Sequence, residues 1–237
     1  MIGTKSLHHR PPNHDHMINK QAYEQLIADL NRVTLVAVSK TKSVEEIKEL
    51  YDLGQKDFGE NYVQELSEKQ SQLPKDIRWH FIGHLQSNKV KQIAPFIHLV
   101  HAVDSLKLLQ EINRQGKKND RVIDCLLQVH IAREETKFGL DENELKTLVN
   151  TNANELHELQ NVRIVGLMGM ASFTDDMEKV RIEFRYLKRL FETYAKLPID
   201  NCQLTILSMG MSSDYFVAIE EGTTMVRIGS LIFGARN

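Results

Sequence analysis

Short apolar runs alternate with longer amphipathic stretches along most of the chain. Each apolar run predicts a buried strand, and each amphipathic stretch predicts a helix that leads to the next parallel strand. After the first run, Ser43 and Glu46 have the spacing of a capping box at the start of a helix. The predicted strands are residues 34–38, 57–59, 79–82, 98–103, 123–129, 162–167, 203–207 and 225–228. The predicted helices include residues 43–53, 61–70, 175–194 and 213–221, and two more that begin near residues 105 and 141.

Eight units of one strand and one helix divide residues 17–237 into pieces of about 28 residues, close to the roughly 30 residues of a strand with its crossover helix. Eight successive units with right-handed crossovers favour an α/β fold, the closed (β/α)8 TIM barrel. We expect a single domain over residues 17–237, with an extra N-terminal helix. An open doubly wound sheet is the alternative, because one miscounted strand would change the topology.

Residues 1–16 have a different composition, with almost nothing apolar to bury. We interpret them as a disordered leader, an artefact of an upstream start or a remnant of production, and Met17 is an alternative start. Flexible histidines could bind metal adventitiously, but they lack the surrounding contacts that fix a natural site. The tract contains four histidines and two prolines: His8, His9, Pro11, Pro12, His14 and His16.

Charge, cysteine content and hydropathy argue against a nucleic-acid-binding, a disulfide-rich and a membrane-spanning protein. The 237 residues include 30 Lys and Arg against 32 Asp and Glu, a formal net charge of −2, which argues against nucleic-acid binding by bulk electrostatics. Cys125 and Cys202 lie in apolar runs, so we expect free buried thiols and no disulfide framework. No stretch approaches the ~18 apolar residues of a membrane span, and the N-terminus has no apolar signal-peptide core. We therefore expect a cytoplasmic protein without a membrane partner.

In such a barrel, ligands bind at the carboxyl ends of the strands. Lys40 follows the first predicted strand after one residue, Ser39, and reaches this rim. A lysine that is partly desolvated there has a lowered pKa, and its amine can attack a carbonyl group. The alternative is a lysine that only returns to solvent at a strand end.

Two small-residue loops lie at the other end of the chain, after the last two predicted strands. Loops at these positions of the barrel often bind phosphate through backbone N–H groups and hydroxyl side chains. Ser212 and Ser213 could act as helix cap and phosphate ligand at once, while Gly229 and Ser230 would let the backbone approach phosphate oxygens. Ordinary turns also use Gly and Ser, so a phosphate site is indicated by the two loops together and not by either loop alone.

The amine and the phosphate loops would be neighbours, because the eighth strand of a barrel closes on the first. A small planar ring with an aldehyde and a phosphate would span the gap between them, and pyridoxal 5′-phosphate is the candidate. Arg227 would then face the ring nitrogen and disfavour its protonation, which limits carbanion chemistry.

Five motifs in order resemble the pyridoxal phosphate homeostasis protein family, which is similar to the barrel domain of alanine racemase. The resemblance implies that Lys40 is the Schiff-base lysine, that Arg227 faces the pyridine nitrogen and that Asn61 lines the cofactor pocket. It also implies that Ser212, Gly229 and Ser230 hold the phosphate. The motifs are Ala37-Val-Ser-Lys40, Phe58-Gly-Glu-Asn-Tyr62, Trp79-His-Phe-Ile-Gly-His-Leu-Gln-Ser-Asn-Lys89, Leu207-Ser-Met-Gly-Met-Ser212 and Val226-Arg-Ile-Gly-Ser-Leu-Ile-Phe-Gly-Ala-Arg236.

Other signals are interpreted as structural. His80 and His84 have the spacing of two zinc ligands on a helix, but on a predicted strand four residues span about 13 Å, so no metal site is expected. Residues 133–139 are too charged for the core and predict a rim loop near the cofactor, without an assigned role. Residues 168–170 are expected to pack beneath the ligand.

A carrier is favoured over an enzyme. Racemisation needs a base on each face of the cofactor, and alanine racemase takes the second from a separate β-domain that is expected to be missing here. We expect a monomer that holds pyridoxal 5′-phosphate, limits the free aldehyde and, by the resemblance, contacts apo-enzymes transiently. The alternatives are a small cofactor-dependent enzyme, a weak racemase or transaminase with Lys40 as its base, and a phosphosugar aldolase that forms a Schiff base.

Overall fold

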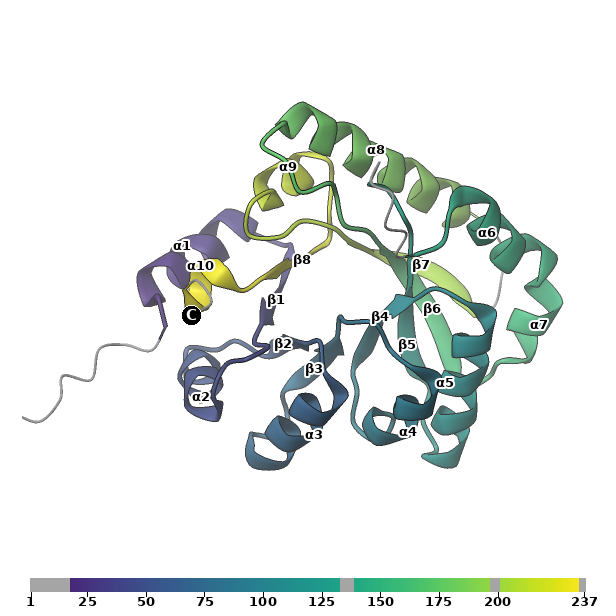
Figure 1. The fold of residues 1–237 in the computed structure, drawn as a ribbon, viewed down its shortest axis with the longest axis horizontal. Helices are drawn as coiled ribbons and strands as arrows, with labels where there is room; N and C mark the ends of the chain where they lie inside the picture. Colours follow the sequence, from purple (N-terminus) through teal and green to yellow (C-terminus); the bar gives the residue numbers. More distant parts are fainter. Residues whose placement is uncertain (1–17, 133–138, 197–200, 235–237) are drawn as a thin grey trace, which may run out of the picture.

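The computed structural model describes residues 18–132, 139–196 and 201–234. Eight parallel strands form one closed barrel in the order β1 to β8, and β8 pairs with β1. The helices surround this barrel (Figure 1). The prediction of a (β/α)8 TIM barrel is therefore confirmed, and the open sheet is excluded. The leader, residues 1–16, and most of the expected rim loop, residues 133–138, lie outside the described residues.

The strands agree with the apolar runs to within one or two residues at most ends. The strands are β1 (Thr34–Val38), β2 (Asp57–Glu60), β3 (Arg78–Phe81), β4 (Leu99–Val103), β5 (Ile123–Gln128), β6 (Val162–Met168), β7 (Cys202–Ser208) and β8 (Met225–Ile228). The main helices are α1 (Lys20–Leu30), α2 (Val44–Asp52), α3 (Val63–Gln72), α5 (Leu106–Lys118), α8 (Met177–Tyr194) and α9 (Tyr215–Glu220). Shorter helical pieces are η1 (Ser87–Lys89), α4 (Val90–Ile93), α6 (Glu142–Lys146), the π-helix η2 (Thr147–Thr151), α7 (Ala153–Glu158) and α10 (Ser230–Phe233).

Local side-chain caps explain where several helices begin. The predicted capping box is present at α2, where Ser43 Oγ accepts from the backbone N–H of Glu46 at 3.1 Å. A second capping box joins Asp141 to Glu144 at the start of α6. The extra N-terminal helix is α1, which packs against α10, and the N–H of Asn19 donates to the carbonyl of Ile232 at 2.7 Å (Figure 1).

The apolar core has two layers. A large layer lies between the strands and the surrounding helices, and it includes Phe58, Trp79 and Phe81. A smaller cluster fills the inside of the barrel with side chains such as Val36 and Leu126. Adjacent residues of a strand face opposite sides, so β2 and β3 present Gly59 and His80 to the inside.

The cysteines agree with the prediction, since Cys125 and Cys202 are both buried and free. Burial raises the pKa of the Cys202 thiol to about 11, and it raises the pKa of the Cys125 thiol well above its usual value. Both are therefore unreactive thiols that pack as small apolar side chains. Among the described residues, no helix combines the length and the apolarity needed to cross a lipid bilayer.

Candidate functional site

All six residues that the sequence predicts for the site line one cavity. It has a volume of about 420 Å³ and lies at the carboxyl ends of β1, β2 and β8. Neighbouring residues of the rim, such as Lys42 and Met170, complete its wall. The six predicted residues that the cavity brings together are Lys40, Asn61, Ser212, Arg227, Gly229 and Ser230.

Lys40 lies on a tight turn directly after β1. The N–H of Lys42 donates to the carbonyl of Ser39 at 3.0 Å and closes this turn, with Lys40 and Thr41 at its centre. Lys42 also lines the cavity, but its amine donates to the carbonyl of Phe233 at 3.0 Å. Both lysines therefore line the same cavity, and the amine of Lys42 is held by a backbone carbonyl.

The loop after β8 approaches the end of β1 closely. A Cβ atom at Gly229 would lie 2.8 Å from the carbonyl oxygen of Val38, so the backbone fits here only without a side chain. The N–H groups of Ile232 and Phe233 both donate to the carbonyl of Gly229 and close the turn that presents Ser230.

The loop after β7 differs from the prediction in one respect. Ser212 and Ser213 line the cavity, but neither caps the following helix, because Asp214 is the N-cap residue of α9. Asp214 Oδ1 accepts from the N–H of Met211 at 2.6 Å, which folds the loop back by one turn before the helix begins. The predicted cap is therefore wrong, and both hydroxyl groups belong to the loop alone.

Arg227 is a cation buried at the base of the cavity. Its guanidinium donates to Ser208 Oγ at 2.5 Å and to the carbonyl of Gly169 at 3.1 Å. Burial lowers the pKa of Arg227 to about 10, and the nearby Asp214 acts in the opposite direction. At neutral pH the group is still charged, so it provides a fixed positive charge in a place with little water.

Asn61 contributes an acceptor with no partner in the described part of the chain. Its Oδ1 atom is buried, and the residue lines the cavity. The backbone of Asn61 packs closely against Gly83, where a Cβ atom would meet the Asn61 carbonyl oxygen at 2.4 Å, so this approach requires glycine. A buried acceptor of this kind is stabilised when a donor reaches it, from water or from a ligand.

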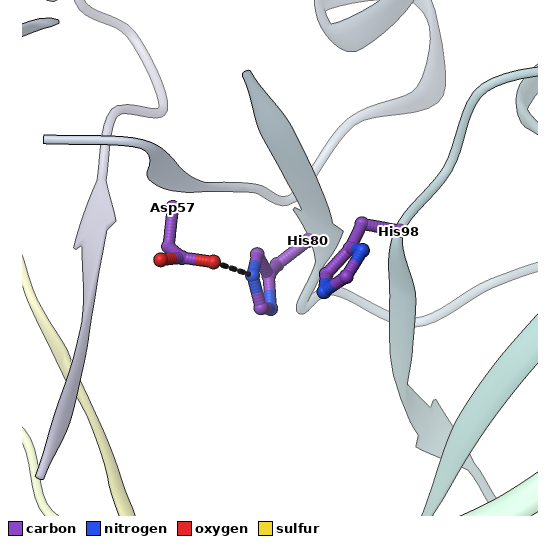
Figure 2. A group of neighbouring side chains, drawn as sticks. All are labelled: Asp57, His80 and His98. Carbon is purple, nitrogen blue, oxygen red and sulfur yellow. Dashed lines mark hydrogen bonds and ion pairs between the residues drawn. The ribbon is translucent and has the colours of Figure 1, made fainter. Parts of the chain in front are cut away.

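A second polar group inside the barrel was not foreseen from the sequence. His80 lies between Asp57 and His98, and its Nε2 atom is 2.9 Å from Asp57 Oδ1 (Figure 2). Its Nδ1 atom is 2.9 Å from Nε2 of His101. Asp57 also forms an ion pair with Arg78, whose guanidinium contacts both carboxylate oxygens. Arg78 and His80 lower the pKa of the Asp57 carboxyl well below its usual range, against the effect of burial.

Potential ligand atoms of Asp57, His80 and His98 lie within 4.8 Å of one another. A cation bound there would have to displace the proton between His80 and Asp57 and would meet the charge of Arg78. His84, which the sequence pairs with His80, is not in this group and lies on the exposed loop after β3. The hydrogen bonds therefore account for the cluster as a structural network.

Comparisons with known proteins agree with this geometry. The profile of the family described as alanine racemase, N-terminal domain, matches residues 18–237. A protein of Aquifex aeolicus named pyridoxal phosphate homeostasis protein is 43% identical over 207 residues, which cover 87% of this chain and 88% of the relative. The chain belongs to the pyridoxal phosphate homeostasis protein family.

Solved structures extend the comparison. PipY of Synechococcus elongatus PCC7942 was solved with PLP bound and superimposes with a TM-score of 0.80 at 33% identity. The superposition covers 90% of this chain and 99% of PipY. An alanine racemase of Clostridium difficile 630 has a TM-score of 0.71 at 14% identity, over 92% of this chain and 56% of the racemase. The racemase shares the barrel fold of the homeostasis family.

Proposed function

We propose that this protein binds pyridoxal 5′-phosphate as a Schiff base on Lys40 and serves cellular homeostasis of the cofactor by holding and delivering it. The observation that carries the proposal is the cavity that joins Lys40, Arg227 and the two Ser- and Gly-containing loops. A volume of about 420 Å³ accommodates a small phosphorylated ring. PipY, a relative with the same fold, was solved with this cofactor bound.

The residues present fit the chemical groups of the cofactor. Buried Asn61 Oδ1 has no partner in the described residues and suits a hydroxyl donor on the ring. Ser212 and Ser230 supply hydroxyl groups for the phosphate, and the bare backbone of Gly229 allows close approach. When bound, the cofactor supplies an aldehyde and an electron-withdrawing ring.

Lys40 performs the covalent step. Its neutral amine attacks the aldehyde carbon, the carbonyl oxygen leaves as water, and a C=N bond joins Nζ to that carbon. Arg227 holds its positive charge near the ring nitrogen and disfavours a proton on that atom. A ring nitrogen without a proton withdraws electrons weakly, which favours holding the cofactor over turning over amino acids.

The lining of the cavity also favours a carrier over an enzyme. Among the described residues that line it, the ionisable side chains are Lys40, Lys42 and Arg227, and there is no carboxylate, imidazole, phenol or thiol. Lys40 could act as one base at the α-carbon of a substrate, but racemisation needs a second base on the opposite face of the cofactor. The described lining offers only Lys42 for this, and its amine donates to the carbonyl of Phe233. We infer a non-enzymatic protein, monomeric and cytoplasmic, that contacts apo-enzymes transiently when it delivers the cofactor.

The proposal is tested by incubation with pyridoxal 5′-phosphate, borohydride reduction and peptide mass mapping. We expect the pyridoxyl mass on the Lys40 peptide of the natural protein and of Lys42→Met, and no adduct in Lys40→Met. The Lys40→Met protein should still bind the cofactor weakly, because the phosphate loops are intact. A reducible adduct in Lys40→Met would refute the role of Lys40, and a natural protein that stays colourless and unmodified would refute the function.

The carrier role is tested separately by solvent-deuterium exchange. Loaded protein is incubated in heavy water with a panel of amino acids, and the α-hydrogen is followed by NMR. We expect no exchange above that of free cofactor at equal concentration. Exchange that depends on protein and is lost in Lys40→Met would identify an enzyme instead.

A further inference from the structure

The turn that carries Lys40 is strained. Thr41, the residue after Lys40, has a φ of 64°, in the left-handed region. Glycine or asparagine is usual at such a position, whereas a β-branched residue is disfavoured there by contacts of its side chain with the backbone. A strained turn persists only when its surroundings hold it in place. The residues on either side of Lys40 must therefore be fixed by neighbouring elements.

A buried group of charges, which we call the Lys69 cluster, consists of Glu60 on β2 with Glu65 and Lys69 on α3. Lys69 Nζ donates to Glu60 Oε1 at 2.8 Å and to Glu65 Oε1 at 2.6 Å. The side chain of Lys69 is 7% exposed and that of Glu60 is 0% exposed. Burial raises the pKa of the Glu60 carboxyl, and the adjacent Lys69 opposes this effect.

The Lys69 cluster holds the backbone on both sides of Lys40. On one side, Lys69 Nζ donates to the carbonyl of Ser39 at 2.7 Å, and Ser39 Oγ donates to Glu60 Oε1 at 2.6 Å. On the other side, the N–H of the strained Thr41 donates to Glu65 Oε1 at 2.6 Å. All three donors of the Lys69 ammonium are thereby used, two on carboxylates and one on the turn.

Stability alone does not explain a buried cluster of this kind. Apolar side chains of similar volume often stabilise a core as well as a buried ion pair does, because ions lose their hydration on burial. An ammonium and two carboxylates give instead a set of directional bonds, each with a fixed geometry. These bonds end on Ser39 and Thr41, so their direct effect is on the position of Lys40.

We propose that Lys69, with Glu60 and Glu65, is a positioning device that sets the Lys40 amine for attack on the aldehyde. The proposal rests on the function proposed for Lys40. The cluster belongs to β2 and α3, whereas the phosphate loops follow β7 and β8, so the two can be separated experimentally. Loss of the cluster slows the covalent step and leaves phosphate-anchored binding unchanged.

The test measures Schiff-base formation by stopped-flow absorbance over a range of pyridoxal 5′-phosphate concentrations. The maximal rate constant reports the covalent step, and the half-saturating concentration reports the preceding binding. We expect Lys69→Met and Glu65→Ala to lower the maximal rate by about tenfold or more, since small displacements of a reacting group have large effects on rate. The half-saturating concentration should stay within about twofold of the natural protein.

Two control variants make the result specific. Glu65→Gln keeps an acceptor oxygen at the same reach, so it should retain most of the maximal rate. Arg78→Met breaks the ion pair with Asp57 at the opposite end of β2, so it should lower stability and leave the rate unchanged. Glu65 is partly exposed, so its replacement should disturb folding less than that of Lys69. Glu65→Ala therefore tests the positioning role if Lys69→Met does not fold.

Each outcome has one meaning. A slower covalent step in Lys69→Met or Glu65→Ala, recovered in Glu65→Gln, supports the positioning role. Folded cluster variants that modify Lys40 at the natural rate overturn it and leave the proposed function intact. A natural protein that forms no adduct on Lys40 overturns the proposed function, and the positioning role with it.

Discussion

His80 Nδ1 and His101 Nε2 lie 2.9 Å apart inside the barrel, and both residues are fully buried. Nε2 of His80 also lies 2.9 Å from Oδ1 of Asp57, whose pKa is held well below its usual range. Nδ1 of His101 has no partner in the described residues. One carboxylate at the amino end of β2 thus anchors a hydrogen-bonded chain of two rings on β3 and β4.

Removal of this carboxylate should destabilise the barrel. Asp57→Asn loses the ion pair with Arg78 and the charged acceptor of His80, so we expect the free energy of unfolding to fall by about 2 kcal/mol. This expected loss is smaller than the loss on breaking a fully buried ion pair, because the side chain of Arg78 is 48% exposed. Urea denaturation measures the change. Cofactor affinity should be unaffected, and a lower affinity would mean that the network extends to the cavity.

Acid should weaken the fold before the carboxylates titrate. Burial holds the pKa of His101 well below its usual value, and the pKa of His98 is lowered in the same direction. The unfolded chain therefore binds these protons first, and stability is lost as the pH falls below about 6.5. The loss is up to about 1.4 kcal/mol per pH unit for the fully buried His101 and smaller for His98, which is exposed to solvent. His101→Gln keeps a donor to His80 but cannot titrate. Denaturation at pH 7.5 and 5.5 should show a smaller loss in this variant, and an equal loss would contradict the assignment.

A methyl group at Gly229 should disturb the site more than the fold. The new Cβ atom would lie 2.8 Å from the Val38 carbonyl oxygen and would push the loop after β8 away from β1. We expect cofactor affinity in Gly229→Ala to fall by about tenfold, because the phosphate group and Lys40 would no longer match. Fluorescence titration measures this affinity.

Gly54→Ala is the matched control for that prediction. Gly54 has a φ of 106°, and no atom lies within 4 Å of the added group, so only backbone strain results. The control should lose about 1 kcal/mol of stability and keep its affinity. Equal affinities for both variants would show that the loop after β8 does not hold the phosphate.

Arg227→Met separates binding from stability. The variant loses the hydrogen bonds to Ser208 and Gly169, but it also removes a desolvated charge, since burial has lowered the pKa of Arg227 to about 10. These effects offset each other, so the unfolding free energy without cofactor should change by no more than about 1 kcal/mol. The absorbance spectrum with cofactor should change, because the ring nitrogen loses its fixed cation. A large loss of stability with an unchanged spectrum would make Arg227 a structural residue only.

The positions of the site residues were predictable because the barrel relates sequence to space in a regular way. The apolar pattern identifies the strand that Lys40 follows and the strand that contains Arg227 near its end. The closure of β8 on β1 brings the two residues together. The Lys69 cluster was not predictable. Lys48 and Asp52 have the same spacing as Glu65 and Lys69, yet their side chains are 48% and 57% exposed.

The difference between these two pairs comes from tertiary packing, which the local pattern does not contain. The side chains of Lys69 and Glu65 are 7% and 24% exposed because α3 turns this face toward the ends of β1 and β2. The interior histidines escaped prediction for a related reason. His101 lies in an apolar run, and the register of β4 with β5 shifts between Val100 and Val103, so a simple alternation of sides does not place its side chain.

The pairing of Val36 on β1 with Arg227 on β8 closes the barrel with the first and last strands. Synthesis on the ribosome proceeds from the N-terminus, so Lys40 emerges early and the arginine and the loop after β8 emerge last. On the proposed function, a chain that lacks β8 would carry the Lys40 amine without Arg227, Gly229 and Ser230. The cofactor site would therefore be complete only after the barrel has closed.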